Sequence, residues 1–144
     1  MKKEKMIFVV LPLVLASVLF VGCATGSQKS VTPEEEISVQ LEKWSEAMVS
    51  KDIDSIMALF SDKFAHYAWE NKEGARTFIE EAIDLGYLDD VKVILDDAAI
   101  KVDGDVGSIY PVDLEGAFGS LSMELIVGHE NGTWLLTGMD APGL

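Results

Sequence analysis

The sequence predicts an α+β protein in which a largely helical N-terminal half is followed by an antiparallel sheet. Between residues 32 and 85, apolar residues recur close to the helical period of about 3.6 residues. After Gly86, apolar and polar residues alternate with the period typical of strands, and turn signals follow at short intervals. We therefore expect the element order α-α-β-α, followed by four or five strands.

Capping residues and apolar spacing predict the three helices. Thr32-Pro33-Glu34-Glu35 provides a capping hydroxyl, a proline at the first helical position and a glutamate three residues after the threonine. A first helix is expected from there to about Ser50, with an inward face formed by Ile37, Leu41, Trp44, Ala47 and Met48. A second, short helix is expected over residues 53–60, and a third over residues 74–85 with Gly86 as its stop.

The strands are predicted from aromatic content, alternation and turn residues. Residues 64–69 are rich in aromatic side chains and are expected to form a strand between the second and third helices. Hairpin turns are expected at Asp103-Gly104, Glu115-Gly116 and Asn131-Gly132, the first and last of type I′. Pro111 lies within a predicted strand and has no N–H to donate, so we expect the sheet to bend there.

Alternation also predicts which sheet residues face the helices, because successive side chains of a strand point to opposite faces. The predicted inward set is Val106, Ser108, Tyr110, Val112, Leu114, Leu121, Met123, Leu125, Val127, Trp134 and Leu136. The predicted outward set is Lys92, Lys101, Asp113, Ser120, Ser122 and Glu124, with Ile109 and Ile126 among them. The inward set carries almost no titratable group, which argues against acid-base catalysis beneath the helices.

The N-terminal segment has the three-part layout of a secretory signal. Lysines 2, 3 and 5 precede an apolar run over residues 6–21, and Gly22 directly precedes Cys23, the only cysteine of the chain. The segment resembles a bacterial lipoprotein signal, which implies cleavage after residue 22 and a lipid on Cys23. An uncleaved membrane anchor is the alternative, but a spanning helix needs about 20 apolar residues. We expect a signal over residues 1–22, a flexible tether over residues 23–31 and one domain over residues 32–144.

The charge of the chain excludes one large class of partners. Of the 11 basic and 25 acidic residues, three lysines and one glutamate lie in residues 1–22, which leaves a formal charge of −16 from Cys23 onward. A domain this acidic, with scattered lysines, is not expected to bind nucleic acid. Two histidines and a single cysteine provide no credible spacing for a metal site, and no cofactor is expected.

Three phrases of the sequence cover residues 51–61, 102–105 and 130–134. Together with the predicted element order, they resemble the nuclear transport factor 2-like superfamily and its bacterial SnoaL-like branch. The resemblance implies a cystatin-like α+β cone, in which a bent antiparallel sheet wraps three helices and leaves an apolar pocket. The superfamily contains isomerases, dehydratases and hydrolases as well as non-catalytic binding modules. The resemblance therefore predicts a fold and not a reaction.

Within such a cone, a small group of residues is expected to line the pocket. The candidates are Tyr67, Trp69, Tyr110, Met123, Leu125 and Trp134. His66 and Tyr67 are the weak candidates for an acid-base group, although neighbours in a strand face opposite ways. Arg76, the only arginine, is either a clamp for a ligand carboxylate or a surface residue paired with Glu73 and Glu80.

These observations favour a lipid-anchored, non-catalytic domain that binds a small apolar ligand or a protein partner of the envelope. The alternative is a SnoaL-like enzyme that acts on a hydrophobic substrate. The expected location is the cell membrane or the outer membrane, with the domain exposed to the periplasm or the cell exterior. The mixed polarity of the outward set predicts a monomer or a weak homodimer.

Overall fold

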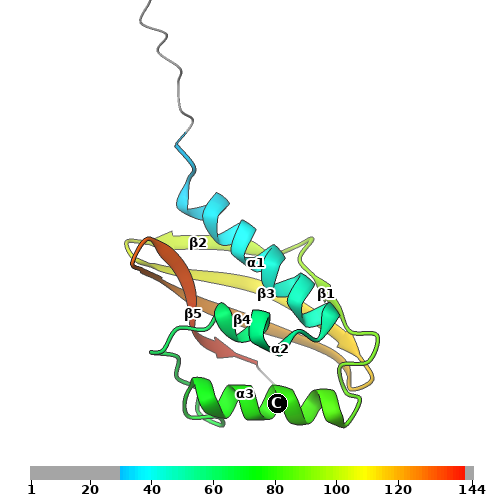
Figure 1. Ribbon diagram of the computed structural model, residues 1–144. Coiled ribbons are helices and arrows are strands. Elements are labelled where there is room, and N and C mark those ends of the chain that lie inside the picture. Colours follow the sequence, from blue (N-terminus) through cyan, green and yellow to red (C-terminus); the bar gives the residue numbers. More distant parts are fainter. Residues whose placement is uncertain (1–29, 142–144) are drawn as a thin grey trace, which may run out of the picture.

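The computed structural model describes residues 30–141, so the predicted signal, Cys23 and most of the predicted tether lie outside the described residues. Three helices come first in the chain and five strands follow (Figure 1). The helices are α1 (Pro33–Ser50), α2 (Ile53–Ala58) and α3 (Lys72–Asp84). The strands are β1 (Lys92–Ile94), β2 (Ala99–Asp103), β3 (Val106–Gly116), β4 (Gly119–Glu130) and β5 (Thr133–Asp140). The predicted α+β class with a bent antiparallel sheet is confirmed.

The sheet is antiparallel throughout and is built around β3. β1 and β2 both pair with β3 along one edge, at residues 113–115 and 106–110 respectively, while β4 pairs with its other edge. β5 completes the sheet beyond β4. The register of β3 against β4 shifts by one residue between Ile109 and Val112, which places a β-bulge at the predicted bend near Pro111.

Helix α1 lies across the concave side of this sheet (Figure 1) and begins with the predicted capping box. Thr32 accepts a hydrogen bond from the Glu35 N–H at 3.2 Å, and the Glu35 carboxylate accepts one from the Thr32 N–H at 3.0 Å. The buried face of the helix is that predicted from the apolar spacing: Ile37, Leu41, Trp44, Ala47 and Met48. The Trp134 indole N–H donates to Glu36 at 3.1 Å, which ties β5 to the first turn of α1.

Helix α3 stands apart from the sheet. Its Cα atoms approach those of α2, but none comes within 8 Å of a Cα atom of any strand. In Figure 1 it lies beyond α2, on the side of the molecule away from α1. Of its buried residues Ala75, Ile79 and Ala82, the last two face a space that the backbone of the sheet does not fill.

The predicted strand over residues 64–69 is wrong. The segment is a turn that makes only isolated bridges, His66 with Glu70 and, just before it, Phe60 with Leu136 of β5. Aromatic content suggested a strand, but these aromatic side chains pack on one another instead of extending along a ladder. The observed order is consequently three helices and then five strands.

The hairpin turns agree with the predictions in part. Asn131 and Gly132 both have positive φ, 51° and 80°, as a type I′ turn requires. The turn predicted at Asp103-Gly104 is displaced by one residue, because β2 ends at Asp103 and only Gly104 of the connecting pair has positive φ. Glu115 and Gly116 belong to β3, and the connection to β4 is formed by residues 117–118.

The predicted facing of residues 106–110 is also wrong. The bulge inserts one extra residue into β3, so alternation reverses on its N-terminal side. Ile109 is buried, whereas Val106 and Tyr110 are exposed on the outer face. Beyond the bulge the predicted facing is confirmed, since Val112, Leu114, Met123 and Leu125 are buried. No helix within residues 30–141 has the length and apolar character needed to span a bilayer.

Candidate functional site

The space between α3 and the sheet is a cavity of about 370 Å³, here called the α3 cavity. Ligand sites in proteins commonly occupy about 300–1,000 Å³, so this volume suits a small molecule or a few side chains. One wall is helical, another is formed by the sheet, and the loops 62–71 and 85–91 complete it. The cavity is lined by Trp44, Met48, Phe60, His66, Trp69, Phe78, Ile79, Ala82, Tyr87, Leu88, Leu114, Phe118, Ser120, Leu121, Ser122, Met123, Met139 and Ala141.

The lining of the α3 cavity is strongly apolar. Among residues 30–141, the lining contains six aromatic side chains other than histidine and three methionines, and no Asp, Glu, Lys or Arg. Within the same residues, only His66 and Tyr87 of the lining are ionisable. Aromatic and thioether side chains offer large polarisable contact areas that adapt to differently shaped apolar groups. The cavity is therefore suited to binding by apolar contact.

A row of stacked rings forms one side of this cavity. The ring centroids of His66 and Trp69 are 4.2 Å apart, and those of Trp69 and Phe78 are 4.6 Å apart. The row joins the loop after α2 to α3, so it fixes the loop and the helix relative to each other. It also places one titratable ring within an otherwise uncharged wall.

The hydrogen bonding of His66 limits the chemistry that this ring offers. Its Nδ1 atom accepts a hydrogen bond from the Ala68 N–H at 3.3 Å. In the neutral ring the proton therefore lies on Nε2, which makes the free nitrogen a donor and not a base. Burial lowers the pKa of His66, and the charge of Asp140 partly opposes that effect. The neutral donor form is thus the form that burial favours.

A second polar group borders the cavity. Trp44 of α1 is only 5% exposed and also borders a smaller cavity of about 30 Å³ that lies between α1 and the sheet. Its indole Nε1 atom has no hydrogen-bond partner among the described residues. A buried donor that no other group meets costs about 1–3 kcal/mol.

The structure brings together only some of the residues predicted to line the pocket. Trp69 and Met123 line the α3 cavity, together with the acid-base candidate His66. Leu125 and Trp134 line the smaller cavity instead. Tyr67 is 72% exposed and Tyr110 is 51% exposed, and neither lines either of these two cavities.

Each displaced tyrosine has a local cause. Tyr110 directly precedes Pro111 at the bulge, so the reversed alternation turns it to the outer face of the sheet, where it lies beside Lys101 and Glu124. Tyr67 lies in a turn and not in a strand. The expectation that its ring and that of His66 point to opposite faces of a strand is therefore wrong. The two ring centroids lie 4.4 Å apart.

Several lining residues could not be recognised from the sequence, because their helical spacing indicated only a packed core. Trp44 and Met48 were expected to face inward, which they do, but a packed core was the simplest reading of that pattern. Phe78 of α3 is 45% exposed and still lines the cavity, as does Tyr87 at 50%. Large apolar side chains that stay partly exposed around a hollow are typical of a binding site, but only the tertiary arrangement reveals them.

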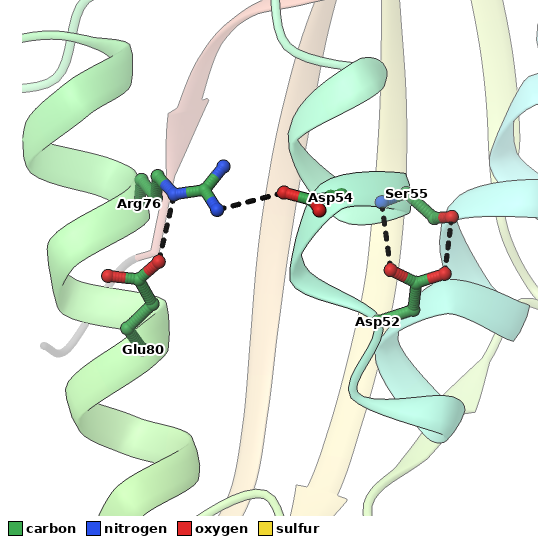
Figure 2. A network of polar contacts seen from close by, with 5 residues as sticks. All are labelled: Asp52, Asp54, Ser55, Arg76 and Glu80. Carbon is green, nitrogen blue, oxygen red and sulfur yellow. Dashed lines mark hydrogen bonds and ion pairs between the residues drawn. The ribbon is translucent and has the colours of Figure 1, made fainter.

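Arg76 holds α3 to α2 and is not part of the cavity lining. Its guanidinium donates to Asp54 of α2 and to Glu80 of α3, both at 2.8 Å (Figure 2). These two partners raise the pKa of Arg76. The predicted pair with Glu80 is confirmed, while Asp54 takes the place expected for Glu73. Because the guanidinium already donates to both carboxylates, the arrangement argues against a role of Arg76 in binding a ligand carboxylate.

The other polar contact in this region is the cap of α2. Asp52 accepts hydrogen bonds from the Ser55 hydroxyl at 2.6 Å and from the Ser55 N–H at 3.2 Å (Figure 2). These bonds lower the pKa of Asp52, since they favour its charged form. Within residues 30–141, no three metal-ligating side chains gather into a group able to hold an ion.

The lowered pKa of His66 predicts that binding in the α3 cavity depends on pH. Because the folded-state pKa lies below the unfolded value of about 6.5, protonation disfavours the folded state with its half-buried ring, and stability declines as pH falls through that value. An apolar occupant buries the ring further. We expect the affinity for a neutral apolar probe to fall when the pH is lowered from 7.5 to 5.5. The expected loss is up to about tenfold for each unit by which the bound probe lowers the pKa of His66 further.

Fluorescence titrations of the wild type and of His66→Phe at both pH values test this expectation. The phenylalanine ring keeps the stack and cannot be protonated in this range. The variant should bind equally at both values. An identical pH dependence in the two proteins would show that another group titrates.

Comparisons with known proteins agree on the fold. No protein-family model and no curated protein matches the chain. Among solved structures, a Nostoc punctiforme protein of unknown function with a cystatin-like fold is 17% identical, with a TM-score of 0.63, and the match covers 79% of this chain and 96% of that one. A nuclear transport factor 2-like protein of unknown function from Pseudomonas putida is 18% identical, with a TM-score of 0.63, over 75% and 84% of the two chains.

A third solved structure carries a proposed activity. It is a proposed dehydratase of the nuclear transport factor 2-like family from Streptomyces avermitilis, 15% identical, with a TM-score of 0.62, and the match covers 76% of this chain and 96% of that one. At these identities the comparisons define a class by architecture alone. The chain has the nuclear transport factor 2-like, cystatin-like α+β fold.

Proposed function

We propose that this protein is a lipid-anchored, non-catalytic binding domain of the cell envelope, and that it holds an apolar group of its ligand in the α3 cavity. The observation that carries the proposal is the lining of that cavity, which is rich in aromatic rings and methionines and to which no described carboxylate or basic side chain contributes. Such a lining offers contact area and little acid-base chemistry. The signal-like segment that ends at Cys23 supports a lipid anchor.

The separation of α3 from the sheet indicates a binding cavity more than a fully packed core. A helix normally buries its apolar face against a neighbour, whereas Ile79 and Ala82 of α3 face a hollow that also exposes Phe78. Polar contacts tie α3 to the segments before it, through Arg76, which pairs with Asp54, and through Lys72, which donates to the Phe60 carbonyl at 2.9 Å. An apolar group in the cavity would complete the burial of this helix.

The proposal predicts that filling the cavity from α3 abolishes binding. Ala82 is 7% exposed and lines the cavity, so Ala82→Phe places a ring in the hollow. We expect the affinity for a neutral naphthylamine probe to fall at least about tenfold, which corresponds to about 1.4 kcal/mol. Ala58→Phe on the exposed end of α2 is the matched control. If both variants bind the probe as the wild type does, the α3 cavity is not the binding site.

An enzyme is the second candidate, because His66 lies in the cavity lining and one structural relative is a proposed dehydratase. Such an enzyme would be an isomerase, dehydratase or hydrolase for a hydrophobic substrate. The Nδ1 bond of His66 leaves it a donor and no carboxylate lines the cavity, so the binding function is the better supported of the two. Turnover of a hydrophobic substrate that His66→Phe abolishes would establish the enzyme instead.

A further inference from the structure

Strand β4 extends beyond its neighbour β5. The pairing of the two strands ends where Glu124 faces Asp140, while β4 begins five residues earlier, at Gly119. Residues 119–123 pair with β3 on one side. Within residues 30–141, no backbone hydrogen bond joins them to any other segment. One edge of β4 is therefore free over this stretch, here called the β4 edge.

The hydrogen-bonding groups of Ser120 and Ser122 point out from this edge. The turn at Asn131-Gly132 makes Glu130 and Thr133 a hydrogen-bonded pair, so even-numbered residues of β4 direct their N–H and C=O groups toward β5. The pairing of Gly116 with Gly119 across the other turn gives the same alternation. Ser120 and Ser122 thus present two N–H and two C=O groups that no described residue meets.

The β4 edge is also a wall of the α3 cavity. Ser120, Leu121, Ser122 and Met123 all line it. Leu121 and Met123 share the inward face with Leu114 and Val112, their partners in β3. A strand added to this edge would lie about 4.8 Å from β4, and every second side chain of that strand would enter the cavity.

The opposite face of the same edge is acidic. Ser120 pairs with Glu115, and Ser122 pairs with Asp113 and donates a hydrogen bond to its carboxylate. Glu124 and Asp140 lie next along the strands on this outer face. The outward side chains of an added strand would therefore lie among these four carboxylates. Lys92 of β1 is paired with one of them, Glu115. Basic side chains complement that surface.

We propose that the β4 edge binds an extended peptide segment in which basic and apolar residues alternate, the apolar side chains filling the α3 cavity. This inference rests on the proposed function and narrows its ligand to a polypeptide. Backbone hydrogen bonds to Ser120 and Ser122 hold the segment, the cavity selects its apolar side chains and the outer carboxylates select its basic ones. This is strand addition to a sheet edge that carries side-chain pockets.

The test uses a blocked hexapeptide in which lysine alternates with leucine and phenylalanine, titrated by calorimetry against the full chain. Ser122→Pro removes an N–H that the fold does not use, and a proline is tolerated at a free strand edge. We expect it to weaken peptide binding at least about tenfold, since one hydrogen bond is lost and its partner is left unpaired. Ser122→Ala removes the same hydroxyl but keeps the N–H, so it should bind the peptide at least about tenfold more tightly than Ser122→Pro does. Thermal unfolding checks that both variants fold.

The outcomes separate this inference from the function on which it rests. Wild-type binding of the hexapeptide, lost on methylation of its backbone nitrogens and in Ser122→Pro, supports the β4 edge. Binding of the neutral naphthylamine probe without binding of the hexapeptide overturns the inference and leaves the proposed function intact. Equal binding by Ser122→Pro and Ser122→Ala also overturns it, because the edge would then carry no part of the recognition.

Discussion

Replacing Cys23 with serine is expected to move the protein from the membrane fraction to the soluble fraction. The proposed anchor is a lipid on the Cys23 thiol, and serine offers no thiol for that modification. Each methylene of an acyl chain buried in a bilayer contributes about 0.8 kcal/mol, and two chains suffice for stable attachment. The acidic domain adds no attraction to anionic lipids, so the loss of the lipid should remove nearly all membrane affinity.

Cell fractionation together with mass measurement of the N-terminal peptide provides the readout. The wild type should show a chain that starts at Cys23 and carries a diacylglycerol mass. Ser27→Ala, in the same stretch of sequence, is the control and should remain lipidated. If Cys23→Ser stays in the membrane fraction at its full length, the segment over residues 6–21 is an uncleaved anchor and the lipoprotein assignment fails.

The helices could be predicted well because the signals that define them are local. The capping box at Thr32 and the apolar spacing from Ile37 to Met48 involve residues three or four positions apart, and these predict α1 to within a residue. The turn at Asn131-Gly132 is similarly local, since it depends on two residues that tolerate positive φ.

The cavity could not be predicted, because it depends on how distant elements are placed. Trp44 and Phe78 look like ordinary core residues in their helical patterns. They line a hollow only because α3 stands off the sheet, and this position is set by contacts such as that of Arg76 with Asp54, which sequence spacing does not reveal. The predicted facing of Tyr110 is wrong for a related reason. One inserted residue reverses the facing of every side chain before it in the strand. Pro111 indicated a bend but did not fix the register.

The free edge of β4 was hidden in the same way. Ser120 and Ser122 were expected on the solvent face, and their side chains are exposed as predicted. Their candidate role depends on their backbone N–H and C=O groups, which point toward the β5 side of β4. These groups stay free because β5 ends at Asp140 and does not reach them. Alternation of side chains predicts faces, whereas strand lengths and pairings decide which backbone groups stay free.

Replacing Gly74 with alanine is expected to destabilise the protein, although glycine inside a helix normally costs about 1 kcal/mol relative to alanine. Gly74 lies in the first turn of α3, where its N–H donates to the Asn71 cap at 3.1 Å. A Cβ atom at this position would lie 1.9 Å from the Trp69 carbonyl oxygen, a backbone atom that cannot move without the loop. We expect a net loss of about 1–3 kcal/mol, as for other overpacked sites.

The same substitution should weaken binding in the α3 cavity, since the loop that must move carries the cavity wall. Trp69 stacks on both His66 and Phe78, so a displaced Trp69 carbonyl disturbs the row of rings that joins the loop to α3. Urea unfolding gives the stability, and titration with the neutral naphthylamine probe gives the affinity. Glu73→Ala, one residue earlier and exposed, should change both by little. A Gly74→Ala variant more stable than the wild type would show that helix propensity, and not this close approach, governs the site.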